Sequence, residues 1–241
     1  MLEVDLQIAP AKDSDFSVRA KFVAPPGVTI LFGPSGAGKS TTLAAIAGLV
    51  KPANGRIALD GDAWFDSHAR VDKPIHQRRV AFVFQSLALF PHLSAVDNVA
   101  YGIDRALGRG ERRRRAAEML ERMKVAHLGA RRPRTFSGGE AQRVALARAF
   151  AMSPKLVLLD EPFSAMDREL RLALAADVRA FVDEAQLPLV HVTHHRNEAR
   201  AIGDRVVLMQ SGEVTASGSV DELLPKLDDT GRFDLGRGGA A

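Results

Sequence analysis

A glycine-rich segment near the start of the chain has the residues needed to hold a phosphate group. It consists of Gly33, Pro34, Ser35, Gly36, Ala37, Gly38, Lys39 and Ser40, which match the pattern G-x-x-x-x-G-K-[ST]. Glycines let backbone N–H groups converge on phosphate oxygens, a lysine places a cation against terminal phosphates, and a hydroxyl can ligate magnesium. We therefore predict a phosphate-binding loop in which Lys39 contacts the terminal phosphates, Ser40 is a magnesium ligand and Thr41 contacts the inner phosphates.

Two adjacent acids, Asp160 and Glu161, follow the apolar run 156–159. Open α/β sheets bind their ligands at the carboxyl ends of strands, where these acids would lie. Neighbouring side chains on a strand point to opposite faces, so the two acids can have separate roles. We expect Asp160 to address magnesium through water and Glu161 to polarise the attacking water. Without the phosphate loop, the pair would equally well be a solvated strand end.

The segment 135–143 supports two interpretations. Ser137 followed by Glu140 three residues later is a capping box, which starts a helix. The same geometry, a serine with Gly138 and Gly139 at a helix N-terminus, offers free N–H groups and a positive dipole end to a terminal phosphate. This segment is informative because a phosphate loop alone is shared by many classes of enzyme.

The hydrophobic pattern predicts the elements that position these residues. Alternating apolar residues at 2–8 and 16–22 predict two paired strands, and the segment after the phosphate loop has helical spacing. Further strands are expected at 28–32, 56–59, 80–84, 156–160, 189–193 and 205–209, the last joined to a final hairpin strand. Because strands alternate with helices, the sheet should be parallel and doubly wound.

We therefore predict an α/β fold with a parallel-sheet core, an N-terminal antiparallel β subdomain and an inserted helical subdomain. One domain should cover residues 1–227, with the helical insertion at about 86–151. The segment 228–241 is rich in glycine and arginine, and we expect a flexible C-terminal tail there.

The composition favours a globular cytoplasmic protein, with 46% hydrophobic and 26% charged residues and no cysteine. No apolar run approaches the roughly 18 residues of a membrane-spanning helix, and the acidic start differs from a signal peptide. The net charge of +4 comes from 33 basic and 29 acidic residues. Its surplus arginines gather at 112–115 and 131–134, where we interpret the first run as a solvated helix face and expect no nucleic-acid partner.

Together, these motifs resemble those of the ATP-binding cassette family. The segment SGGEAQR at 137–143 is similar to the family's signature sequence, and the other motifs come in the family's order. Gln85 resembles a glutamine that contacts magnesium and senses the membrane partner, His194 resembles the switch histidine at the terminal phosphate, and Phe16 stands where an aromatic ring stacks under adenine. Taken alone, Gln85 could be a polar strand end, His194 an ordinary histidine and Phe16 a core residue.

The resemblance implies a P-loop NTPase fold that binds ATP and Mg²⁺. It assigns catalysis to Glu161 and His194, and metal contacts to Ser40, Gln85 and Asp160. It also implies a head-to-tail dimer, in which Ser137, Gly138 and Gly139 of one copy close over ATP held by the other, with Asp167 in the joining loop 164–167. The chain offers no evident arginine finger of its own, which leaves room for these partner groups.

Within this family, the segments 63–67, 78–80, 83–85 and 89–94 resemble molybdate importer ATPases. Sulfate, polyamine and iron importers remain alternatives. Such a protein would lie on the cytoplasmic face of the inner membrane, bound to integral permease subunits and indirectly served by a solute-binding protein. His195 departs from the family, which commonly has aspartate there. Alternatives of another class are a soluble, non-transport ATPase of the family and a nucleotide-binding regulator that barely hydrolyses ATP.

Overall fold

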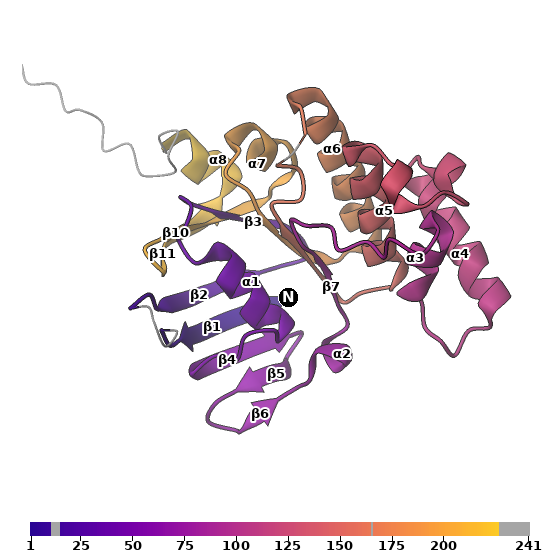
Figure 1. Ribbon diagram of the computed structural model, residues 1–241. Coiled ribbons are helices and arrows are strands. Elements are labelled where there is room, and N and C mark those ends of the chain that lie inside the picture. Colours follow the sequence, from indigo (N-terminus) through magenta and orange to yellow (C-terminus); the bar gives the residue numbers. More distant parts are fainter. Residues whose placement is uncertain (11–14, 165, 227–241) are drawn as a thin grey trace, which may run out of the picture.

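A computed structural model describes residues 1–10, 15–164 and 166–226, and its strands form a single mixed sheet (Figure 1). The strands are β1 (Leu2–Ile8), β2 (Val18–Ala24), β3 (Gly27–Phe32), β4 (Asn54–Leu59), β5 (Asp62–Asp66), β6 (Val71–Asp72), β7 (Val80–Val83), β8 (Leu156–Asp160), β9 (Pro188–Val192), β10 (Arg205–Gln210) and β11 (Glu213–Ser219). The helices are α1 (Lys39–Ala47), α2 (Ile75–Arg78), α3 (Ala95–Tyr101), α4 (Arg109–Arg122), α5 (Gly138–Ala151), α6 (Arg168–Ala185), α7 (Arg196–Ile202) and α8 (Val220–Leu223). Short 3₁₀ turns lie at Ala126–Leu128, Pro133–Thr135 and Leu224–Lys226.

The sheet has a parallel half and an antiparallel half. Strands β10, β3, β9, β8 and β7 run parallel in that order. Strands β2, β1, β4, β5 and β6 form antiparallel pairs. Strand β11 joins the halves, because it pairs with β10 along its length and meets β2 at Glu213 and Arg19. The predicted α/β class, with a parallel core and an antiparallel N-terminal part, is confirmed.

Strand β5 was not predicted from the sequence, because its apolar residues do not alternate. Trp64 and Phe65 are neighbours, and both are buried. The register between β4 and β5 shifts between Ile57 and Ala58, so a bulge interrupts the pairing there. A bulge bends a strand and re-aims its side chains, which obscures the period of two expected for a strand.

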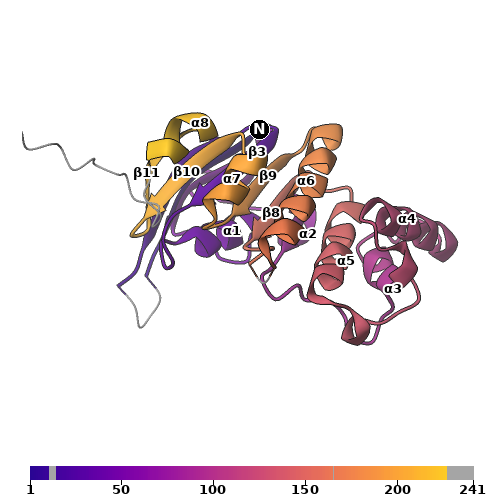
Figure 2. The ribbon, with the colours of Figure 1, turned by 90° about the horizontal axis from the view of Figure 1, so that it is seen from above.

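Helices cover both faces of the sheet (Figure 2). On one face, α1 packs Leu43 and Ile46 against Leu31 of β3. On the other face, α6, α7 and α8 pack against the intervening side chains of the same strand, such as Ile30 and Phe32. Strand β3 is therefore buried on both sides, as expected for a central strand of a parallel sheet.

The chain between β7 and β8 forms α3, α4 and α5 beside the sheet (Figure 1). The first helix begins at Ala95, later than the helical stretch predicted from residue 86. The buried Asn98 holds this loop, since its amide exchanges hydrogen bonds with the backbone of Phe90 and also donates to Leu93 O and Ser94 O. Side-chain hydrogen bonding of this kind favours a loop over a helix.

The arginine run on α4 has local partners. Glu111 pairs with Arg114 and Arg115, one turn further along the helix, and Asp97 pairs with Arg113. This arrangement confirms the interpretation of a solvated helix face. In the described ranges, no helix is both apolar enough and long enough to span a bilayer. The expected tail at 228–241 lies outside the described residues.

A buried arginine fastens α1 to the strands beside it. Arg78 is 1% exposed, and its guanidinium donates to the carbonyls of Ala45 and Ile46, at 3.1 and 2.9 Å, where α1 ends. It also donates to Lys73 O at 2.8 Å. The bond to Ile46 O satisfies a helix-end carbonyl, whereas Ala45 O also accepts from Gly48 N at 3.0 Å.

Replacement of Arg78 by Gln should lower the free energy of unfolding by about 3 kcal/mol, because it removes a buried guanidinium and its bonds to Ile46 O and Lys73 O. Chemical denaturation measures this loss. The matched control is Arg79→Gln, since the neighbouring side chain is exposed and donates to a single carbonyl, Ser153 O. Equal losses in the two variants would contradict the role given to Arg78.

Candidate active site

The predicted phosphate loop lies between β3 and α1, and the predicted acid pair lies at the carboxyl end of β8. Strands β3 and β8 both pair in parallel with β9, so their carboxyl ends meet at one edge of the sheet. An open cleft of about 680 Å³ lies at this edge. Its lining residues are Phe16, Ser35, Gly36, Ala37, Gly38, Lys39, Ser40, Thr41, Gln85, Asp160 and Glu161.

Two glycines give the loop a path that a larger residue would disturb. At Gly33, with φ +153°, an added Cβ would lie 2.1 Å from the carbonyl oxygen of Met209. At Gly38, with φ +95°, it would lie 2.9 Å from Val18. Glycine adopts such conformations at little steric cost, so the loop can lead directly into α1. The N-terminus of α1 then presents its backbone N–H groups and dipole to the cleft, an arrangement suited to an anion.

The ammonium group of Lys39 is held by the loop itself. Its Nζ donates to the carbonyls of Gly33 and Pro34, both at 2.8 Å. Burial lowers the pKa of Lys39, while the charges of Glu161 and Asp160 oppose this change. The lysine is therefore a positive group already in place beside the cleft, and phosphate oxygens could replace its carbonyl partners.

Ser40 and Asp160 meet across the cleft. The Ser40 hydroxyl donates to Oδ1 of Asp160 at 2.9 Å, and Gln85 lines the same cleft. Burial raises the pKa of Asp160, as does the nearby Glu161, whereas Ser40 and Lys39 oppose the shift. A hydroxyl, a carboxylate and an amide are oxygen ligands that suit Mg²⁺, which usually takes few protein ligands and the rest from water and phosphates. These residues therefore fit a magnesium ion bound with a nucleotide.

Glu161 lies just beyond β8 and faces His194. Its backbone adopts φ +46°, and its N–H donates to Val192 O on β9 at 3.1 Å. Its Oε1 lies 3.3 Å from Nδ1 of His194. Asp160 and Glu161 thus separate as expected, one toward Ser40 and the other toward the histidine. This geometry suits a base whose orientation is set by a second polar group.

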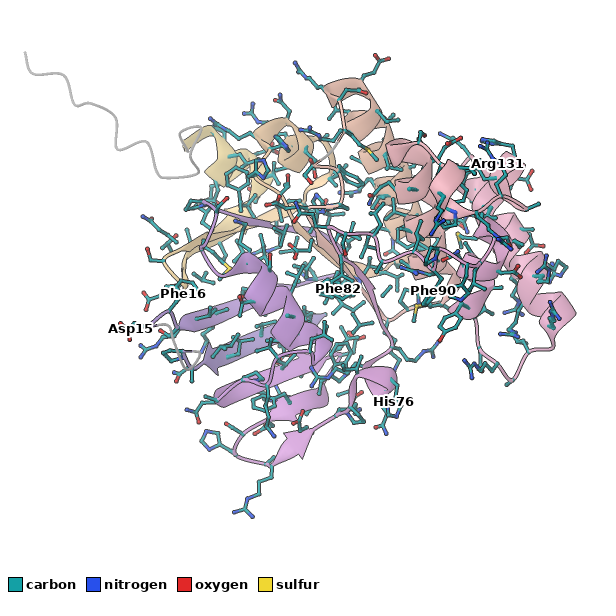
Figure 3. All side chains as sticks on the ribbon, viewed as in Figure 1. Asp15, Phe16, His76, Phe82, Phe90 and Arg131 are labelled. Carbon is teal, nitrogen blue, oxygen red and sulfur yellow. The ribbon has the colours of Figure 1, made fainter. Side chains whose placement is uncertain are left out.

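Phe16 lies outside the strand in which the sequence placed it. Strand β2 begins at Val18, and Phe16 is 41% exposed, so the alternative core role is wrong. Added Cβ atoms at Gly38 and Gly212 would lie 3.5 and 3.6 Å from its ring, which places the ring against the phosphate loop (Figure 3). An exposed ring beside such a loop can stack on a purine base.

The signature residues do not line this cleft. Ser137 caps α5, which lies apart from α1 in Figure 1, and Gly138 and Gly139 form its first turn. The predicted capping box is present: Ser137 Oγ accepts from Glu140 N, and Oε2 of Glu140 accepts from Ser137 N at 2.7 Å. The hydrogen bond from Ser137 N and then the contact with His127 lower the pKa of Glu140 to about 2. Both interpretations of this segment therefore agree with its geometry.

The first turn of α6, which follows the acid pair along the chain, contacts both the signature segment and the residues just before the helix. An added Cβ at Gly139 would lie 2.8 Å from the Leu170 side chain, so the signature turn packs against the first turn of α6. Asp167 caps that helix, and its Oδ1 accepts from Leu170 N at 2.9 Å. Arg171, one turn later, donates to Met166 O at 2.7 Å.

A buried acid behind His194 was not anticipated from the sequence. Glu198 is 2% exposed and pairs with the fully buried His191 of β9. Burial opposes its ionisation, but the hydrogen bonds of His191 and Thr193 hold the pKa of its carboxyl below its usual value. Thr193 also accepts from His195 N at 3.0 Å, which fixes the backbone after His194. Only the spacing of Glu198 along an apolar helix face could have indicated its burial.

Comparison with known proteins assigns the family. The model of the family described as "ABC transporter" matches residues 20–164, which is more than half of the chain. The chain belongs to the ABC transporter family. Two relatives, both called molybdenum import ATP-binding protein ModC, come from Albidiferax ferrireducens and Brucella melitensis biotype 1, at 44% and 40% identity. The alignments cover 84% and 90% of this chain but 54% and 60% of the relatives, so the ABC chain spans less than two thirds of their length.

Solved structures of ABC proteins share the fold. The ATP-binding cassette MJ0796, solved as a dimer in a post-hydrolysis state bound to ADP and Pi, superposes with a TM-score of 0.78 at 29% identity and covers 91% of this chain and 99% of its own. The cbiO1 protein from Clostridium perfringens is part of the ABC transporter complex cbiONQ. It superposes with a TM-score of 0.81 at 26% identity, over 93% of this chain and 90% of its own.

His195 should make the stability of this ABC chain depend on pH. Burial lowers the pKa of His195, and the charges of His194 and Arg171 lower it further. The charges of Glu198 and Glu161 oppose this shift. The folded state therefore binds fewer protons than the unfolded state near the ordinary histidine pKa of about 6.5. Stability should fall as the pH falls through that value.

The variant His195→Asn should flatten the dependence of the unfolding free energy on pH between about 7.5 and 5.5. Denaturation at a series of pH values measures the slope. The control His76→Asn removes an exposed histidine on α2 and should keep the steeper slope. A slope in His195→Asn equal to that of the unmodified chain would contradict the assignment.

Proposed function

We propose that this chain binds and hydrolyses ATP as the motor subunit of an importer. The observation that carries the proposal is the convergence in one cleft of Lys39, the Ser40 and Asp160 pair, and Glu161 backed by His194. Each group has the chemistry that one part of a bound nucleotide requires. The two relatives named as import ATP-binding proteins support the same activity.

The geometry supports a direct attack of water on the terminal phosphate. Glu161 accepts the proton of that water, and its orientation is held by His194, which can also contact a terminal phosphate oxygen. The bond from the terminal phosphorus to the bridging oxygen breaks, and ADP and inorganic phosphate form. Lys39 neutralises charge on the phosphates, and Phe16 supports the adenine ring. A magnesium ion at Ser40, Gln85 and Asp160 would neutralise further phosphate charge.

A second copy of the chain completes this site in our proposal. Ser137 and the first turn of α5 have the N–H groups for a terminal phosphate, but they lie outside the cleft of their own chain. A head-to-tail pair would bring them to the phosphates held by the other copy, with the loop 164–167 between the copies. The dimeric form of the cassette MJ0796 supports this arrangement.

A membrane subunit fits a second surface, which we call the apolar groove. It has a volume of about 570 Å³ and lies between the end of α1 and the C-terminal half of α5. Its lining includes the exposed residues Leu49, Ile75, Phe84, Tyr101 and Met152. Figure 3 shows Phe82 and Phe90 between the sheet and the helices α3 to α5. Exposed apolar surface of this kind favours a binding partner.

The position of the apolar groove explains how ATP could act on that partner. Helix α1 begins at the phosphate loop and α5 begins at Ser137, so the two helices that wall the groove start at the two phosphate-binding ends. Closure around ATP would move these helices relative to each other, and hydrolysis would release them. We propose that a helix of an integral permease docks there, with the ABC chain peripheral on the cytoplasmic face of the inner membrane.

Molybdate is the solute that we propose. Relatives named for molybdenum import, including one from Rhizobium meliloti at 41% identity, support this choice. A solute-binding protein would deliver the oxyanion to the permease from outside. Sulfate, polyamine or iron would pass through a different permease without changing any residue of the ATP cleft.

Replacement of Glu161 by Gln should abolish turnover while ATP binding persists. The amide cannot accept a proton, so kcat should fall about 100-fold or more, and ATP-bound dimers should accumulate. Phosphate release and light scattering with ATP and Mg²⁺ measure the two effects. The control Glu121→Gln changes an exposed acid on α4 and should behave as the unmodified chain. Normal turnover, or a monomer in the presence of ATP, would contradict the role of Glu161.

Reconstitution with the native permease and binding protein should show ATPase activity that rises when molybdate is added. The reason is that a loaded binding protein favours the permease state that closes the ABC dimer. Parallel reactions with sulfate and with a polyamine measure selectivity. Stimulation by sulfate alone would assign the chain to another branch and leave the hydrolysis proposal intact.

A further inference from the structure

A second cavity lies behind His194, and we call it the basic cavity. It has a volume of about 540 Å³ and lies between the first turns of α6 and α7. Its lining includes Arg168 and Arg171 of α6, Arg196, Asn197 and Arg200 of α7, and His194. Four guanidinium groups that line one hollow create a strongly positive local potential.

The charge of the basic cavity is only partly balanced by its neighbours, since Arg171 lies beside Glu198 and Arg196 donates to the carbonyl of Leu224. The side chains of Arg168 and Arg200 make no hydrogen bond or ion pair within the described ranges. Arg171 Nε is buried without a hydrogen-bond partner there and lies 4.0 Å from Glu198. Glu198 is the acid in this lining, and its other oxygen is already paired with the buried His191. Within the described residues, the guanidinium groups of Arg168 and Arg200 therefore line the cavity with donors that have no acceptor.

The basic cavity adjoins the hydrolysis site through a narrow crevice. Glu161 lines both the nucleotide cleft and this crevice. His194, His195 and Glu198 line both the crevice and the basic cavity. The residue proposed to activate water therefore lies next to the residues that wall the basic cavity, with Thr193 between them, and the crevice itself has no room for a water molecule.

We propose that the basic cavity binds a tetrahedral oxyanion. Planar guanidinium groups match the oxygens of phosphate and similar anions with paired hydrogen bonds. Two sources share this chemistry: the phosphate released by hydrolysis, which rests on the proposed function, and a free oxyanion such as phosphate or molybdate from solution. Binding itself does not require that the chain hydrolyse ATP.

Binding of inorganic phosphate to the full-length chain tests the site directly. Calorimetric titration is done with the nucleotide cleft filled by ADP and Mg²⁺, and again without nucleotide. The double variant Arg168→Gln, Arg200→Gln should weaken phosphate binding about tenfold in the ADP-loaded chain, because two charged donors are lost. The control is a second double variant, Arg70→Gln with Arg109→Gln, which removes two exposed arginines outside the cavity. It should bind phosphate as the unmodified chain does.

The site is disproved if the ADP-loaded chain binds no phosphate, or if the double variant binds it with unchanged affinity. Failure of ADP to bind would instead contradict the nucleotide proposal, and the titration without nucleotide would still decide the oxyanion site. Circular dichroism of the double variant confirms that it is folded, which is expected because both changed side chains are exposed.

A single-turnover comparison separates the two sources. Acid quenching measures cleavage of ATP, and a phosphate-binding fluorescent protein measures release. The quantity compared is the delay between ATP cleavage and phosphate release. If the site receives the product phosphate, this delay should differ between the double variant and the control variant. If it receives free oxyanion, the delay should stay the same, and inhibition by added phosphate or molybdate should weaken about tenfold. An unchanged delay together with unchanged inhibition would overturn the proposal.

Discussion

The buried ammonium group of Lys39 is the charge around which the candidate site is arranged. Burial disfavours this charge, and the carbonyls of Gly33 and Pro34 hold it with the loop folded around them. Asp160 and Glu161 lie close enough to favour the ammonium form, while burial, and to a smaller extent the nearby Glu161, raises the pKa of Asp160. The cleft thus contains one positive and two negative groups in partly buried surroundings. A polyphosphate and a divalent cation together complement both signs, whereas either alone would leave one of them unbalanced.

The first turn of α6 links the signature segment to the chain that follows His194. Gly139 of the signature turn packs on Leu170 of α6, and Arg171 one turn later binds the carbonyl of Met166. Because Arg171 also lies near Glu198, the first turn of α6 contacts the signature segment, Met166 and the segment that follows His194. A partner that displaces the first of these segments would therefore act on the last through packed side chains, which is the kind of connection that a two-state motor needs.

Sequence patterns predicted those parts of the molecule whose signal is local. The phosphate loop, the acid pair and the capping box each occupy a few consecutive residues, and the structure places Ser40, Asp160 and Glu161 in one cleft. The features that were missed depend on long-range geometry. Strand β5 lost its alternation to a bulge, and the exposure of Phe16 depends on where β2 begins. The burial of Glu198 was not predicted, since a polar residue on a helix is ordinarily exposed, and its pairing with His191 depends on how α7 packs on β9.

The arginines show the same distinction between sequence and space. The run 112–115 is the densest cluster of charge in the chain, but Glu111 on the same helix pairs with Arg114 and Arg115, and Asp97 on α3 pairs with Arg113. Arg168 and Arg200 are more than thirty positions apart, and α6 and α7 bring them to one cavity. Charge that converges in a hollow acts on a ligand from several sides, whereas charge along a solvated helix is screened and paired. The arginines with most influence on an anion are therefore those that the fold brings together, and the fold has placed them beside His194.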